Sequence, residues 1–114
     1  MISVEKLKSL GVNVEEGLAR CMNKEDFYLM LVNKALADNK LELLEQQIKN
    51  KDLDGAFETA HALKGMLGNL SLTPLVDPVT EITELLRAEK DADYAALCAA
   101  LADARAELLR LRDE

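Results

Sequence analysis

The chain has 114 residues, of which 49% are hydrophobic and only 4% aromatic, and its formal net charge is −7. This length suits one domain with its own core. The acidic balance argues against a nucleic-acid ligand, because phosphate backbones are bound by clustered Lys and Arg. No apolar run approaches the ~20 residues that span a bilayer, and no signal-peptide pattern is apparent at the N-terminus. We expect one cytoplasmic domain over residues 1–114, with no nucleic-acid or membrane partner.

Leu and Ala dominate the apolar residues, and apolar positions recur at helical spacing, which together predict an all-α protein. The predicted helices cover residues 4–10, 14–22, 25–49 (with a start at 24 as the alternative), 52–70, 74–90 and 91–112. The polar segment 37–40 marks either a kink or a break in the third of them.

Side chains that can cap a helix mark several of these starts. Ser3 and Asn13 precede the first two helices and are expected to be their N-caps. Asp52 and Asp91 stand in matching contexts, since each follows a lysine and has a second aspartate two residues later. We therefore expect both aspartates to cap the helices that follow them.

The clearest break in the second half lies at residues 71–74. Thr73 is expected to cap a helix with Pro74 at its first position, and Pro78 is expected to loosen that helix start. Cys21 and Cys98 lie on apolar helical stretches and are expected to be buried, reduced thiols. Short connections imply antiparallel neighbours, so we expect an antiparallel up-down four-helix bundle with an extra short N-terminal helix or helices across one end.

His61 is the only histidine of the chain. At about 100° per residue, four residues share one arc of the helix: His61, Lys64, Gly65 and Gly68. A different arc is apolar and is predicted to face the core; it contains Ala56, Leu63, Leu67 and Leu70. Each glycine inside a helix costs roughly 1 kcal/mol relative to alanine. Bare backbone beside the histidine therefore indicates that something large comes close.

This stretch resembles the signature of the histidine-containing phosphotransfer (HPt) family, in which His-x-Leu-Lys-Gly is followed by small residues and then Asn-Leu-Gly. The matching residues are His61, Leu63, Lys64, Gly65, Asn69 and Leu70, with Gly68 where the family has a small residue. Ser71 departs from the pattern, since glycine is common there, and we expect it to affect how the helix ends. Residues 14–20 also resemble the first helix of the family.

The resemblance implies a phosphorelay intermediate of two-component signalling. His61 would accept a phosphoryl group from the aspartyl phosphate of a response-regulator receiver domain and pass it to another receiver. Lys64 can neutralise charge on that group, while Gly65 and Gly68 leave room for docking by the partner. The expected partners are receiver domains and, as a further candidate, a hybrid sensor histidine kinase, with this chain a monomer. The divalent metal belongs to the receiver, so we expect neither a metal site nor another cofactor here.

The chain has no Gly-x-x-x-x-Gly-Lys-Ser/Thr loop, so we expect a phosphohistidine carrier without ATP-dependent kinase activity. Thr83 and Glu84 are candidates to hold the second ring nitrogen of His61, and ordinary surface positions are the alternative for both. The alternative function is a non-catalytic helical docking module that binds a receiver or sensor kinase without carrying phosphate. Whether the domain is free-standing or part of a larger kinase stays open.

Overall fold

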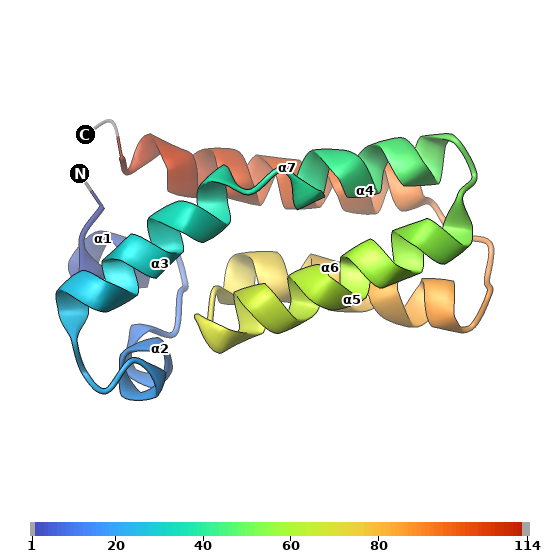
Figure 1. The fold of residues 1–114 in the computed structure, drawn as a ribbon. Coiled ribbons are helices and arrows are strands. Elements are labelled where there is room, and N and C mark those ends of the chain that lie inside the picture. Colours follow the sequence, from blue (N-terminus) through green and yellow to red (C-terminus); the bar gives the residue numbers. More distant parts are fainter. Residues whose placement is uncertain (1, 113–114) are drawn as a thin grey trace.

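The computed structural model describes residues 2–112, and the regular structure within them is entirely helical (Figure 1). This confirms the predicted all-α class. The helices in chain order are α1 (Val4–Ser9), α2 (Val14–Arg20), α3 (Glu25–Ala37), α4 (Lys40–Lys49), α5 (Leu53–Asn69), α6 (Thr73–Arg87) and α7 (Tyr94–Arg110).

The helices α4, α5, α6 and α7 form an antiparallel up-down bundle, in which α5 packs against both α4 and α6, and α6 packs against α7 (Figure 1). The short helices α1 and α2 lie at one end of this bundle, beside the start of α3. The predicted fold is thereby confirmed. Cys21 and Cys98 are buried and not joined in a disulfide, as expected. No helix in residues 2–112 has both the length and the apolar character needed to cross a membrane.

The polar segment 37–40 is a true break between α3 and α4. Asp38 has extended backbone (φ −67°, ψ 141°), and its Oδ1 accepts a hydrogen bond of 2.8 Å from the Lys40 N–H. Arg105 of α7 holds this break from across the bundle. Its Nε donates to the Leu36 carbonyl over 2.9 Å, its Nη2 lies 3.5 Å from the Asp38 carbonyl, and its Nη1 pairs with Glu42. The packing of α7 thus fixes how α3 meets α4.

The start of α6 differs from the prediction by one residue. Leu72 is the N-cap and Thr73 is already helical, so Pro74 occupies the second helical position. The Thr73 hydroxyl donates to the Ser71 carbonyl over 3.3 Å instead of accepting a bond from α6. Pro78 lies inside the helix, which continues without a break to Arg87. Pro78 is past the first turn, so it removes one interior hydrogen bond and crowds the carbonyl of Pro74, and the buried face of α6 outweighs that cost.

Of the two predicted aspartate caps, Asp52 is confirmed and Asp91 is wrong. Asp52 caps α5 and accepts a 3.1 Å hydrogen bond from the Gly55 N–H, as expected, and Ser3 and Asn13 likewise cap α1 and α2. Asp91 is not a cap, because the second aspartate of its pair, Asp93, accepts from the Ala96 N–H over 3.0 Å and α7 begins at Tyr94.

Candidate functional site

The helix α5 carries His61 near its middle and divides into two faces, as the spacing of its residues predicts. The core face is fully buried at Ala56, Leu63 and Leu67, and Leu70 is 6% exposed. His61 and Gly65 are exposed on the other side, and Lys64 and Gly68 are partly exposed. The structure therefore brings the four predicted site residues to one solvent-facing strip of α5.

An aromatic ring lies beside the imidazole. The ring of Phe57, one turn before His61, has its centroid 6.0 Å from that of the imidazole at an interplanar angle of 25°, within the usual range for aromatic pairs. The guanidinium carbon of Arg87, on α6, lies 5.6 Å from the Phe57 ring centroid. His61 is exposed, and within residues 2–112 nothing hydrogen-bonds to its imidazole. Sequence reasoning missed Phe57, although residues four apart on a helix are neighbours.

Lys64 extends from α5 toward α6. Its Nζ lies 3.7 Å from Oε1 of Glu84, and Nη1 of Arg87 lies 3.5 Å from the same oxygen. The side chains of Lys64 and Glu84 are 36% and 51% exposed, so solvent reaches both. One carboxylate oxygen thus lies between two cations next to the site.

Neither glycine of the strip is needed for packing. A Cβ built on Gly65 or Gly68 would have no other side chain or other helix of the described chain within 4 Å. Gly17 on α2 is different, because its Cβ would lie 2.5 Å from Cε1 of Tyr28 and 2.8 Å from the Leu70 carbonyl oxygen. Gly17 is therefore a packing glycine, whereas Gly65 and Gly68 leave open space beside α5.

The end of α5 explains why glycine is common at the position of Ser71. Ser71 has a left-handed backbone (φ 53°), and its N–H donates to the Gly68 carbonyl over 3.0 Å. The Leu72 N–H donates to the Leu67 carbonyl over 3.2 Å, which completes the usual hydrogen-bond pair of such a helix end. The Ser71 hydroxyl is buried and has no hydrogen-bond partner. The expectation that Ser71 affects the helix end is confirmed.

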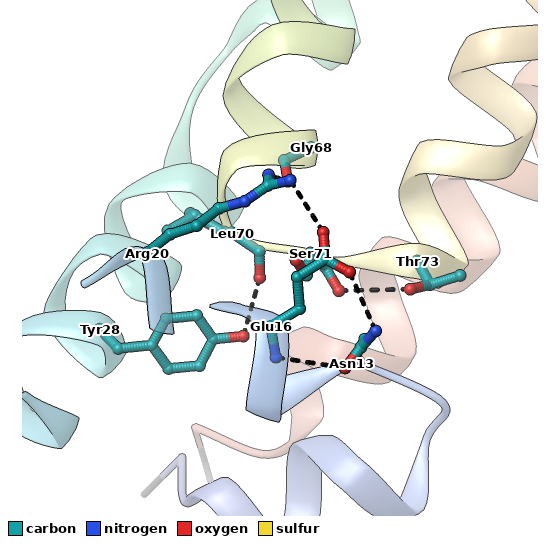
Figure 2. Close-up of polar contacts among 8 residues, drawn as sticks. All are labelled: Asn13, Glu16, Arg20, Tyr28, Gly68, Leu70, Ser71 and Thr73. Carbon is teal, nitrogen blue, oxygen red and sulfur yellow. Dashed lines mark hydrogen bonds and ion pairs between the residues drawn. The ribbon is translucent and has the colours of Figure 1, made fainter. Parts of the chain in front are cut away.

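Figure 2 shows how α2 and α3 hold this end of α5. Nη1 of Arg20 donates to the Gly68 carbonyl over 2.5 Å, and Nη2 pairs with Glu16 over 2.8 Å. The last turn of α5 has no basic residue of its own, so Arg20 supplies the positive charge that favours a helix C-terminus. The Tyr28 hydroxyl donates to the Leu70 carbonyl over 2.8 Å, and burial raises the pKa of Tyr28 to about 12, which keeps this donor protonated.

The two candidates for the second ring nitrogen of His61 lie elsewhere. Thr83 is fully buried, and its hydroxyl donates to the Val79 carbonyl over 2.7 Å, so it does not reach the imidazole. Glu84 is directed to Lys64 instead. Within residues 2–112 no group of three or more His, Cys, Asp or Glu side chains could hold a metal ion.

The Hpt domain family model matches residues 32–114, which include α4 to α7 and the whole of the site. No match was found among curated proteins or among solved structures. The matched range begins within α3 and leaves out α1 and α2, so the likeness of residues 14–20 to the family's first helix stays a prediction. With nearly three quarters of its length matched, this chain belongs to the Hpt domain family and takes part in phosphotransfer in two-component phosphorelay signalling.

Proposed function

We propose that His61 is the residue that carries the phosphoryl group. It accepts this group from the aspartyl phosphate of a receiver domain and passes it to the aspartate of another receiver. The observation that carries the proposal is the exposed imidazole on α5, flanked by Lys64 and by two glycines whose open side faces solvent. The membership of the Hpt family supports it. A sensor histidine kinase that holds such a receiver is a further candidate partner.

In the transfer the nucleophile is the lone pair of one imidazole nitrogen. This nitrogen attacks the phosphorus, a P–N bond forms, and the P–O bond to the aspartyl carboxylate breaks with its electron pair leaving on the carboxylate. The other ring nitrogen keeps its proton during this step. Phosphoryl transfer depends mainly on alignment and charge compensation, and Lys64, one turn from His61, provides a mobile positive charge for the phosphoryl oxygens. The onward step is the reverse reaction with a second aspartate.

We further propose that residues 1–114 act as one domain. The support is the set of contacts from α2 and α3 to the end of the site helix, through Arg20 to the Gly68 carbonyl and Tyr28 to the Leu70 carbonyl. These contacts fix the last turn of α5, where the docking glycine Gly68 lies. A receiver that approaches His61 would therefore meet a rigid surface with little ordering cost.

The test is label transfer from a phosphorylated receiver to the wild-type chain and to His61→Gln. The wild type should take up the label in an acid-labile, alkali-stable form, as expected of a phosphoramidate. The variant should remain folded by circular dichroism and bind the receiver, yet take up no label. Label on His61→Gln at the wild-type level would overturn the proposal. Receiver binding without any label on the wild type would favour the alternative, a docking module that carries no phosphate.

A further inference from the structure

The cation closest along the helix to His61 already has an anionic partner. Nζ of Lys64 lies 3.7 Å from Oε1 of Glu84, and Arg87 holds that same carboxylate from the other side at 3.5 Å. Because the guanidinium of Arg87 also lies over the Phe57 ring, two contacts from neighbouring groups restrain Arg87. Glu84 is thereby kept on the side of α6 that faces the site.

The pair between Lys64 and Glu84 is weak enough to be exchanged. Both side chains are more than a third exposed, and the separation of 3.7 Å is near the upper limit for an ion pair. Exposed pairs of this kind contribute little and are screened by salt. A phosphoryl group carries roughly −1.5 to −2 charges near neutral pH, whereas the carboxylate carries one. Lys64 can therefore leave Glu84 for a phosphoryl group. The net stabilisation is then smaller than that of the new contact alone, because the contact between Lys64 and Glu84 is lost.

We propose that Glu84 is a positioning residue that competes with the phosphoryl group for Lys64, and so makes phosphorylated His61 a better donor. This inference rests on the proposed role of His61. The carboxylate takes no part in bond making. It lowers the stability of the phosphorylated histidine relative to a phosphorylated receiver, because the contact between Lys64 and the phosphoryl group forms only after the contact with Glu84 breaks. The charge on Glu84 thus favours onward transfer.

The experiment measures how label distributes at equilibrium between a receiver and this chain. Glu84→Gln, which keeps the shape and removes the charge, should shift the distribution toward the histidine by about two- to five-fold, the range expected of an exposed ion pair. The shift should shrink as salt concentration rises. The thermal midpoint should stay within about 2 °C of the wild type, because the residue is exposed. Glu84→Ala serves as a second variant and should shift the distribution in the same direction.

The matched control is Glu81→Gln, which removes the same charge one turn earlier on α6. Glu81 is exposed and has no ion pair with a described residue, so its variant should leave the distribution unchanged. A double-mutant cycle completes the test, because Glu84→Gln should have no effect once Lys64→Ala is present.

Three results would overturn the inference: no shift in Glu84→Gln, an equal shift in Glu81→Gln, or a shift that persists in the Lys64→Ala background. The first would mean that the pair has no effect on transfer. The second and third would mean that Glu84 acts through general charge and not through Lys64. If the wild type takes up no label, the proposed function itself has failed, and the inference fails with it.

Discussion

Gly68 gives the most direct test of whether the open side of α5 serves a partner. The Cβ of a Gln at this position would have open space around it. Gln is a better helix former than Gly by up to roughly 0.8 kcal/mol in a helix interior. Since Gly68 lies next to Asn69, the last residue of α5, we expect only part of this gain. A stabilisation of about 0.3–0.6 kcal/mol would raise the Tm by roughly 1–4 °C.

The same substitution should impair transfer from a receiver. A glutamine side chain would extend into the space through which the receiver must approach His61, and a loss of docking energy near 1.4 kcal/mol corresponds to about a tenfold fall in transfer rate at limiting receiver concentration. The assay pairs thermal unfolding with receiver-dependent label transfer on one preparation. Phosphoramidate is a small donor without a docking surface, so any modification of His61 by it should be equal in this variant and in the wild type.

Gly17→Ala is the control, because its Cβ would meet Tyr28 and the Leu70 carbonyl. It should lower the Tm, as expected for an overpacked site that costs about 1–3 kcal/mol. Unchanged receiver transfer by Gly68→Gln would refute the idea that the glycine serves docking. A fall in the Tm of Gly68→Gln would refute the assignment of open space at that position.

Two further substitutions test the charge and the helix end of the site. Lys64→Ala should slow transfer about tenfold or more, because a hydrogen bond to a charged group is lost. The Tm of this variant should stay within about 2 °C of the wild type. Rapid-quench transfer rates equal to those of the wild type would contradict this expectation. Ser71→Gly should raise the free energy of unfolding by about 1 kcal/mol, because glycine relieves the left-handed backbone and removes a buried unpaired hydroxyl. Ser71→Ala keeps the backbone strain, so its free energy of unfolding, measured by chemical denaturation, should rise less than that of Ser71→Gly. An equal rise in the two variants would count against the strain argument.

Local patterns were sufficient for most of the helices and for the two faces of α5. Apolar spacing separated the buried Leu63 and Leu67 from the exposed His61, because a helix repeats every 3.6 residues whatever surrounds it. The N-caps were less predictable. A lysine and two aspartates stand in the same spacing around the start of each of two helices. The first aspartate, Asp52, caps α5, whereas the second, Asp93, caps α7. The Tyr94 hydroxyl donates a 2.7 Å hydrogen bond to the Lys90 carbonyl, which orders the residues just before α7. This contact agrees with a helix that begins at Tyr94 and is capped by Asp93.

The polar surroundings of the site could not be predicted, because they depend on how separate helices meet. The contact of Glu84 with Lys64 requires the register of α6 against α5, which no local pattern contains. The bond from Arg20 to the Gly68 carbonyl joins residues 48 positions apart. Ser71 lies between these two cases, because the sequence predicted its effect only in part. Its departure from glycine was visible in the sequence, but the left-handed backbone that makes glycine common there was visible only in the structure.

The contacts of Arg105 have a consequence for the order in which the chain folds. Its guanidinium meets Leu36, Asp38 and Glu42, which are 69, 67 and 63 residues away in sequence. Closing so long a loop is entropically costly and slow compared with the formation of individual helices. We therefore expect the angle between α3 and α4 to be set late in folding, when α7 docks. Before α7 docks, the bonds from Arg105 to the Leu36 and Asp38 carbonyls are absent, so we expect the corner between the two helices to be more flexible.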